Sequence, residues 1–204
     1  MNLPWLTILM LLPILGSVVL ALMPVRAEGE RAPAGTLHKQ LAIGVSVLTL
    51  LLGVALAINY SPGGGVQYEE QVSWIELFGA YYALGLDGIG LTLVLLTVIL
   101  TPVVMLASWH DGDHGRWGAK GFFAWILALE GLSIGVFAAT DVFLFYVLFE
   151  ATLIPVYFLV AGYGGPDRVR AAVKFLLYSL FGGLVMLAAV IALYVESSKT
   201  ETGA

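Results

Sequence analysis

The chain has 204 residues, of which 60% are hydrophobic and 11% are charged, and its mean hydropathy is +0.95. Soluble domains carry about a quarter charged residues, so these values exclude an ordinary soluble enzyme, a disordered regulator and a nucleic-acid binder. Because these residues include no cysteine, they hold no disulfide scaffold, thiolate metal site or thiol nucleophile. The net charge of −5 says little about partners, since the position of each charge matters more in a membrane protein.

Six stretches of the sequence are apolar over about 20 residues, the length that an α-helix needs to cross the hydrocarbon core of a bilayer. Strands of a membrane β-barrel would be shorter and would alternate apolar with polar residues, so the pattern predicts an all-α polytopic membrane protein. The first stretch is too long for a signal peptide, and no basic residue precedes it. We expect a single transmembrane domain over residues 1–204, with six spans at 3–23, 41–60, 84–109, 121–139, 142–163 and 171–194.

The connection between the second and third expected spans, residues 61–83, has two distinct halves. It begins with a turn signal, Ser61-Pro-Gly-Gly-Gly. Its later part carries aromatic residues, among them Trp74, Phe78 and Tyr82, that suit the membrane–water interface. Two interpretations stay open, an amphipathic segment on the outer surface and an ordinary aromatic belt.

Basic residues are confined to alternate connections, as the positive-inside rule describes. The other connections hold acidic residues and no Lys or Arg. The pattern predicts that the first, third and fifth connections are cytoplasmic and that both termini lie outside. All basic residues except Lys199 fall in or beside those three connections, and they are Arg26, Arg31, Lys39, Arg116, Lys120, Arg168, Arg170 and Lys174.

Two acidic residues, Glu130 and Glu150, lie in the middle of the fourth and fifth expected spans. A charged residue near the centre of a span costs about 2.5–3.5 kcal/mol on translocon scales, so each must be protonated, be paired or face a hydrated interior. The short Thr140–Asp141 turn makes these spans an antiparallel hairpin. A rise of ~1.5 Å per residue then puts both carboxyls about 12–14 Å below its outer end. The sequence does not decide whether they face one another.

Pro155 lies five residues after Glu150 and leaves the Ala151 carbonyl without its helical donor. The resulting opening could admit water, or the proline could be purely architectural. A buried carboxyl that exchanges partners can load and release a proton. The alternative is a neutral acid that only hydrogen-bonds between helices. The residues alone favour the relay role for Glu150 and leave both roles open for Glu130.

The remaining polar residues have simpler interpretations. Lys174 begins the last expected span and could snorkel to the cytoplasmic interface. Asp87 fits a simple interfacial acid. The turn at residues 110–114 holds two histidines and two aspartates, but short polar turns of this kind are usually solvated, so we expect no metal there. The sequence has no phosphate-binding loop, zinc-helix signature or nucleophile elbow.

Several stretches together resemble the antiporter-like subunits of respiratory complex I, and most closely the subunit M (chain 4) family of NADH–quinone oxidoreductase. The agreement covers most of residues 84–193 in the right order. The matching stretches are LDGIGL (86–91), LTP (100–102), ASW (107–109), LEG (129–131), DVFLFYVLFEATLIPVYFL (141–159) and AVKFLLYSLFG (172–182).

The resemblance implies a proton-pumping subunit in the membrane arm of a complex that oxidises NADH and reduces quinone. It assigns Glu150 an essential place in the proton path, paired with a lysine on a later, broken helix, and makes Glu130 and Lys174 further candidates. It implies no redox active site and no cofactor on this chain, with flavin and iron–sulfur clusters on partner subunits. The expected partners are other antiporter-like and small hydrophobic membrane-arm subunits, the lipid bilayer and protons, with no nucleic acid. The expected location is an energy-coupling membrane, namely the bacterial inner (plasma) membrane.

Members of this family have about fourteen spans in inverted repeats. The six expected here correspond to the N-terminal part, so we expect a chain truncated relative to the family or a split gene, without the lysine partner of Glu150. Two alternative functions stay open. One is a subunit of a multisubunit cation/proton antiporter, and the other is a structural membrane-arm subunit whose glutamates only hold helices together.

Overall fold

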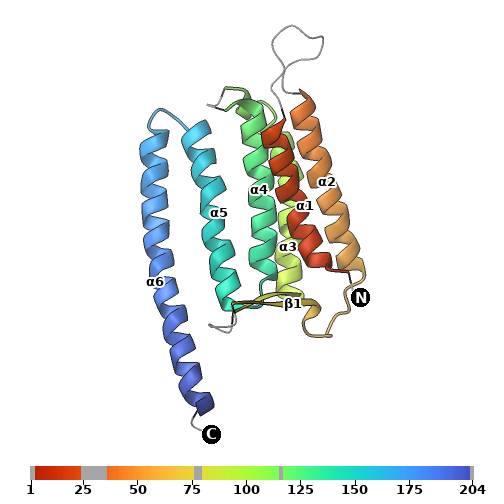
Figure 1. Ribbon diagram of the computed structural model, residues 1–204. Coiled ribbons are helices and arrows are strands. Elements are labelled where there is room, and N and C mark those ends of the chain that lie inside the picture. The colour runs from red at the N-terminus through yellow and green to blue at the C-terminus, as the bar shows by residue number, and fades with distance from the viewer. Residues whose placement is uncertain (1–2, 24–35, 76–79, 115–116, 203–204) are drawn as a thin grey trace.

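Six long apolar helices run side by side in the part of the chain that the structure describes (Figure 1). The computed structural model describes residues 3–23, 36–75, 80–114 and 117–202. Each of the six helices contains a segment long and apolar enough to cross a membrane, which confirms the all-α polytopic class. The elements are α1 (Trp5–Leu22), α2 (Thr36–Ile58), β1 (Gln67–Ile75), β2 (Ala80–Leu86), α3 (Gly88–Ala107), the 3₁₀ turn η2 (Asp111–His114), α4 (Gly118–Ala138), α5 (Val142–Tyr163) and α6 (Arg168–Thr202).

The helix bounds differ from the expected spans where polar ends of helices extend beyond the apolar run. Helix α2 begins at Thr36 and α6 at Arg168, a few residues before the expected spans, because charged residues are tolerated once a helix leaves the hydrocarbon layer. The third span was expected from residue 84, which is wrong by four residues. Residues 80–86 form strand β2, and Asp87 then starts α3.

Helix α4 lies at the centre of the bundle, where it packs on α1, α2, α3 and α5. Helix α5 separates α4 from α6, which lies at the outer edge (Figure 1). Buried side chains form two clusters along the helices. The cluster nearer the β-strands includes Leu9, Leu84 and Ile134, and the other includes Leu20 and Phe123. By contrast, only 6% of the most apolar window of α6 is buried.

Two glycines let α4 approach α1 closely. A Cβ atom placed on Gly131 would lie 2.6 Å from the carbonyl oxygen of Met10, and one placed on Gly135 would lie 2.6 Å from the Met10 sulfur. The glycines are four residues apart and therefore lie on one helix face. This small-xxx-small spacing allows helix backbones to come together in membranes, where apolar burial gives little drive for helices to associate.

The connection between α2 and α3 is an antiparallel β-hairpin, with Val72 opposite Tyr82. Neither interpretation of residues 61–83 specified a strand pair, and both stay open, since a hairpin can carry interfacial aromatic residues. Strand pairing satisfies the backbone groups of these aromatic and β-branched residues. The predicted turn is present, with Gly63 and Gly65 at φ +85° and +72°. The Thr140 N–H donates to the Ala83 carbonyl at 3.0 Å, which joins the hairpin to the turn between α4 and α5.

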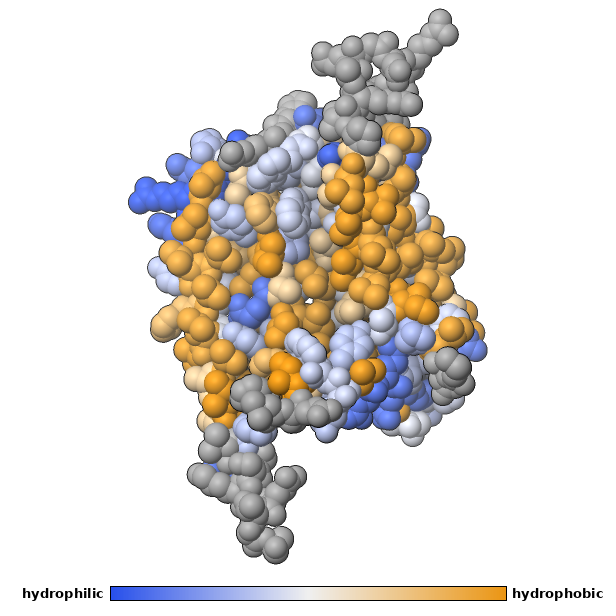
Figure 2. Space-filling model, in the orientation of Figure 1, coloured by the Kyte–Doolittle hydropathy of each residue, from blue (hydrophilic) through white to orange (hydrophobic). Residues whose placement is uncertain are grey.

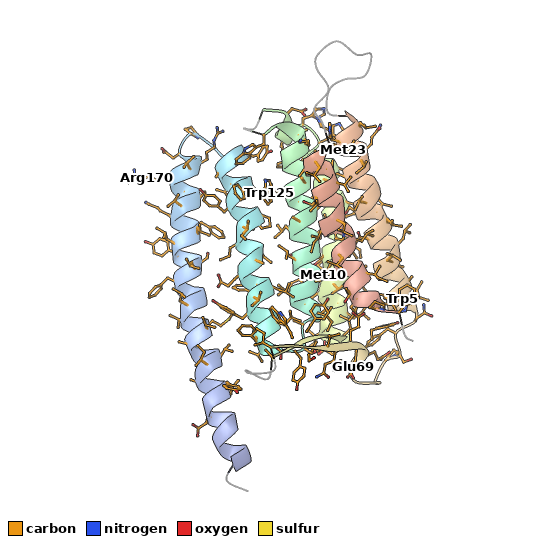
Figure 3. All side chains as sticks on the ribbon, viewed as in Figure 1. Trp5, Met10, Met23, Glu69, Trp125 and Arg170 are labelled. Atoms are coloured by element: carbon orange, nitrogen blue, oxygen red, sulfur yellow. The ribbon has the colours of Figure 1, made fainter. Side chains whose placement is uncertain are left out.

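The basic residues Lys39, Lys120, Arg168 and Arg170 lie at the end of the bundle opposite to the acidic β-hairpin. Figure 3 shows Arg170 at the end opposite to Glu69. Figure 2 shows a largely hydrophobic band at mid-height, with hydrophilic residues above and below it. Both ends of the chain lie at the hairpin end (Figure 1). Four charged residues on which the topology prediction drew lie outside the described residues, and they are Arg26, Arg31, Glu76 and Arg116.

Candidate functional site

Glu130 lies in the interior of the bundle, on the face of α4 that meets α2. Its side chain is 2% exposed, and the Ser46 hydroxyl of α2 donates to its Oε1 at 3.1 Å. Ser46 is itself fully buried, and Glu130 Oε2 has no hydrogen-bond partner among the described residues. Within the same residues no basic side chain pairs with this carboxyl. The Ser46 hydroxyl is therefore the one hydrogen-bond donor to the Glu130 carboxyl among the described residues, and Oε2 accepts no hydrogen bond from them.

Glu150 lies on the other side of the hairpin, where α5 meets α6. Its residue is partly buried, and its Oε1 atom is fully shielded yet finds no hydrogen-bond partner in the described part of the chain. The carboxyl lies directly against Gly183 of α6, so that a Cβ atom placed there would collide with it. A polar oxygen is thus held in an interface of apolar helices without a donor, which is costly unless a proton or a cation reaches it.

The two acidic residues therefore do not face one another. Glu130 is held by Ser46 on α2, whereas Glu150 lies against Gly183 on α6. In Figure 1, α2 and α6 lie on opposite sides of the α4–α5 pair. Similar depth along the hairpin, as expected from residue counting, does not bring the carboxyls together, because each points to a different neighbour.

Lys174 is exposed on α6. It precedes Gly183 by nine residues, which corresponds to about 13 Å along the helix axis. The structure thus places Lys174 well away from the level of the Glu150 carboxyl and toward the basic end of the bundle. No salt bridge involves Lys174 among the described residues.

Pro155 is buried in α5, which continues without interruption from Val142 to Tyr163. The ring removes the donor for the Ala151 carbonyl, one residue after Glu150. The helix therefore carries a carbonyl that lacks its helical donor one residue after Glu150, whose Oε1 has no donor among the described residues. Both groups are acceptors, so a water molecule or another donor would serve either of them.

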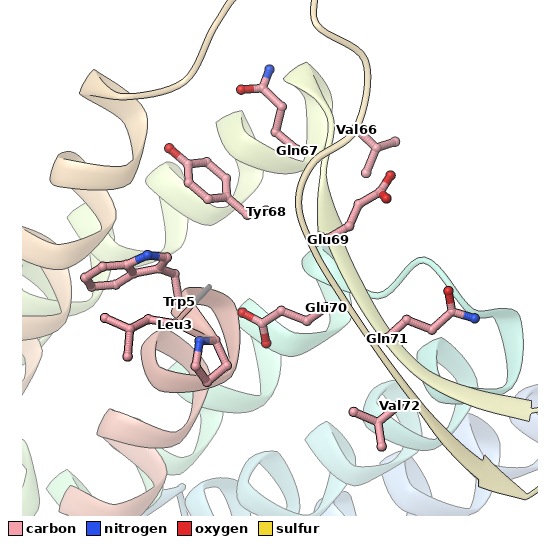
Figure 4. Close-up of a pocket in the computed structure, with 10 residues that line it drawn as sticks. Leu3, Trp5, Val66, Gln67, Tyr68, Glu69, Glu70, Gln71 and Val72 are labelled. Carbon is pink, nitrogen blue, oxygen red and sulfur yellow. The ribbon is translucent and has the colours of Figure 1, made fainter. Parts of the chain in front are cut away.

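At the hairpin end, Glu70 acts on a helix far from it in sequence. Its Oε1 accepts a hydrogen bond from the Leu6 N–H at 2.7 Å, and its Oε2 accepts from the Thr7 N–H at 3.1 Å and from the Thr7 hydroxyl. The Thr7 hydroxyl also lies 2.8 Å from the Tyr82 hydroxyl, and burial raises the pKa of Tyr82. Figure 4 shows Glu70 directed toward the start of α1 and Glu69 directed away, beside a groove of about 840 Å³.

Two further acids in the connections, Asp87 and Asp141, cap the helices that follow them. The Asp87 carboxylate accepts from the Gly90 N–H at 2.6 Å, and Asp141 accepts from the Leu144 N–H at 2.9 Å. An aspartate just before an apolar run is an N-cap signal that could have identified both. No such local signal exists for Glu70, which lies on a strand 64 residues from its partner Leu6.

At the basic end, Lys39 is nearly buried and forms a salt bridge with Asp113 at 2.7 Å. Its Nζ also lies 5.4 Å from the centre of the Trp109 ring. Asp113 belongs to the turn of histidines and aspartates at residues 110–114, so part of that polar turn serves an ion pair. Lys120 donates to the Ala21 and Met23 carbonyls at 3.1 and 2.9 Å, where α1 ends.

Comparison with known proteins confirms the resemblance seen in the sequence. Residues 139–203 match the family described as NADH:quinone oxidoreductase/Mrp antiporter, TM, a segment that includes Glu150, Lys174 and Gly183. The chain is 43% identical to NADH-quinone oxidoreductase subunit M of Mycobacterium tuberculosis (strain H37Rv) over 230 aligned positions, covering 99% of this chain and 40% of the relative. It is 36% identical to subunit M of Rhodobacter capsulatus, covering 96% of this chain and 37% of that relative.

Solved structures agree with the fold. Respiratory complex I from Thermus thermophilus with bound NADH contains a chain that superimposes with a TM-score of 0.77 at 30% identity, covering 95% of this chain and 36% of that one. A chain of the Mrp complex from Dietzia sp. DQ12-45-1b superimposes with a TM-score of 0.75 at 21% identity, covering 95% and 20%. The latter likeness is one of fold. The chain thus spans about two fifths or less of the length of these relatives.

Proposed function

We propose that this chain is a membrane-arm component of a proton-pumping NADH–quinone oxidoreductase and that Glu150 carries a proton in its translocation path. The observation that carries the proposal is the Oε1 of Glu150 at the α5–α6 interface, which is shielded and has no donor among the described residues, inside the segment that matches the family. A carboxyl in this position must take up a proton or a cation to be stable, and giving it up again is the elementary step of a relay.

Glu130 and Lys174 are proposed as further members of the path, with different support. Glu130 is a buried acid that accepts a hydrogen bond from the Ser46 hydroxyl, a group that can both donate and accept hydrogen bonds. Lys174 lies toward the basic end of the bundle and is exposed on α6, where a cation could exchange protons with the cytoplasmic side. Neither contacts Glu150, so transfer among the three would require intervening donors such as water.

The redox chemistry of such a complex would take place on partner subunits. Iron–sulfur clusters are bound by cysteine thiolates in most proteins, and these 204 residues include no cysteine. Iron–sulfur clusters would therefore be held by other chains, and we propose the same for the flavin. The task of this chain would be to bind and move protons, in contact with neighbouring membrane-arm subunits and lipid.

The charge distribution supports one orientation in the membrane. Lys39, Lys120, Arg168 and Arg170 lie at the end opposite to the acidic β-hairpin. By the positive-inside rule this end would face the cytoplasm, and both ends of the chain would lie outside. Bacterial relatives support the inner (plasma) membrane as the location.

The decisive experiment replaces Glu150 in the intact complex. NADH-driven proton uptake into inverted membrane vesicles should be lost in Glu150→Gln while the complex still assembles, because glutamine keeps the shape but cannot carry a proton. Glu150→Asp should retain part of the uptake. The matched control is Glu69→Gln, which neutralises an exposed acid on the hairpin and should leave uptake unchanged. Full uptake in Glu150→Gln would overturn the proposal, and failed assembly would favour the structural role.

A subunit of a multisubunit cation/proton antiporter is the second candidate, because the matched family includes Mrp antiporters and the fold is shared with an Mrp complex. Purification of the native complex separates the two candidates. An oxidoreductase should copurify with flavin absorbance and NADH oxidation, whereas an antiporter complex should carry neither and should exchange cations for protons in vesicles.

A further inference from the structure

We infer that Gly183 is a positioning residue for Glu150: the space left by its missing side chain is where the carboxyl of Glu150 lies. This inference rests on the proposed function of Glu150. It adds that Gly183 is the residue that allows the Glu150 carboxyl to extend toward α6. It concerns a residue that touches the carboxyl without taking part in proton transfer itself.

The geometry around Gly183 is specific to this carboxyl. Gly183 is buried although α6 is mostly exposed. The three atoms nearest to a Cβ placed on it are Oε1, Cδ and Oε2 of Glu150, with Cδ at 2.6 Å and Oε2 at 3.2 Å. Any other residue at this position would force the carboxyl out of its place or push the helices apart.

Other glycines of the chain have different neighbours. Gly131 of α4 faces atoms of α1, and Gly135 faces Met10 of α1 and Leu148 of α5, so both serve helix packing. For Gly182, the residue before Gly183, no described residue outside its own turn of α6 has a heavy atom within 4 Å of the Cβ position. Among the glycines that the structure describes, Gly183 alone has its three nearest neighbours in one carboxyl group.

The consequence for proton transfer is directional. With Gly183 in place, the Glu150 carboxyl extends away from α4 and from Glu130, and its Oε1 faces a part of α6 that offers no donor. A donor or cation that serves Oε1 must therefore reach the α5–α6 side. A side chain at position 183 would move the carboxyl from this place, and a displacement of about 1 Å in a reacting group can reduce a rate about 10²-fold.

The test uses the whole complex with two neighbouring alanine variants. Gly183→Ala should reduce NADH-driven proton uptake about tenfold or more, whereas Gly182→Ala should leave it unchanged. Infrared difference spectroscopy gives a readout that does not depend on turnover. The carboxyl band that disappears in Glu150→Gln should shift in Gly183→Ala and stay in place in Gly182→Ala. An unshifted band with normal uptake in Gly183→Ala would overturn the inference.

A change of side-chain length separates positioning from packing. Glu150→Asp withdraws the carboxyl by one methylene, so Gly183→Ala should harm uptake less in the Glu150→Asp background than in the native one. If Gly183→Ala prevents assembly, Glu150→Ala combined with Gly183→Ala should restore assembly by removing the collision. Continued failure to assemble would mean that position 183 meets something other than Glu150.

The two proposals fail in different ways. Normal proton uptake in Glu150→Gln with a band that still shifts in Gly183→Ala would remove the relay role and keep the position of the carboxyl. Lost uptake in Glu150→Gln with an unshifted band in Gly183→Ala would keep the relay and remove the role of Gly183.

Discussion

Glu70 caps the start of α1 from a distance of 64 residues, accepting the Leu6 N–H at 2.7 Å. Helix α1 has no side-chain cap of its own, no acidic residue in its first turn and no basic residue in its last. Its other end is supported by Lys120, which donates to the carbonyls of Ala21 and Met23. A negative group at the N-terminus and a positive group at the C-terminus both stabilise the helix dipole.

Glu70→Ala should therefore weaken the attachment of α1 to the hairpin. Loss of a helix cap costs about 0.5–2 kcal/mol, so we expect a lower thermal midpoint of unfolding in detergent, followed by circular dichroism. The matched control is Glu69→Ala, because Glu69 lies next to Glu70 on the same strand but is exposed and directed away from α1. Equal midpoints for the two variants would contradict the capping role.

Lys120→Met should affect the opposite end of α1. The variant keeps the long apolar stem but removes the donor to the Ala21 and Met23 carbonyls, and hydrogen bonds from charged groups are worth about 1.5–3 kcal/mol. We expect limited proteolysis to cleave the segment after α1 faster in Lys120→Met than in Arg170→Met, which removes an exposed cation at the same end. Identical cleavage rates would show that the Lys120 contacts contribute nothing measurable.

Glu130 can be tested for the two roles that the sequence leaves open. If it only hydrogen-bonds between helices, Glu130→Gln should keep both stability and proton uptake, because the amide oxygen still accepts from Ser46. If it carries protons, uptake should fall while assembly is unchanged. Ser46→Ala is expected to destabilise the complex by about 1–3 kcal/mol by leaving a buried acceptor without its donor. The same substitution should cost less in the Glu130→Leu background.

The close approach of α1 and α4 predicts a strong effect at Gly131. Gly131→Leu should prevent α4 from packing on Met10 and should reduce the amount of assembled complex on native gels, since overpacking typically costs about 1–3 kcal/mol or more. Gly44→Ala is the control, because nothing lies within 4 Å of its Cβ position. Alanine there should be neutral or stabilising by up to about 1 kcal/mol. Normal assembly of Gly131→Leu would contradict the packing argument.

The number and type of the spans could be predicted because apolar runs of helical length have few alternatives in a bilayer. The depth of Glu130 and Glu150 followed from the short turn between α4 and α5. Their directions did not, since the contacts of Glu130 with α2 and of Glu150 with α6 depend on packing between distant segments. The hairpin was missed because residues 67–75 carry an interfacial composition that fits several backbone conformations.

The helix caps likewise differ in whether they can be predicted from neighbouring residues in the sequence. Asp87 and Asp141 lie directly before the helices they cap, so their residue type and position could have identified them as caps, although Asp87 was interpreted only as an interfacial acid. Glu70 and Lys120 act across the fold, and no spacing in the sequence links them to α1. Gly183 is similar, because only the arrangement of α5 against α6 reveals what its missing side chain accommodates.

The two contacts that hold the ends of α1 also impose an order on biosynthesis. The ribosome makes α1 before the residues that satisfy its ends, since Glu70 follows its partner Leu6 by 64 residues and Lys120 follows its partner Ala21 by 99. The nascent helix α1 therefore enters the bilayer without the hydrogen bonds that cap its two ends. It reaches its final packed position only after the hairpin has crossed the membrane and α4 has been inserted. The final packing of α1 thus depends on the synthesis and insertion of α4.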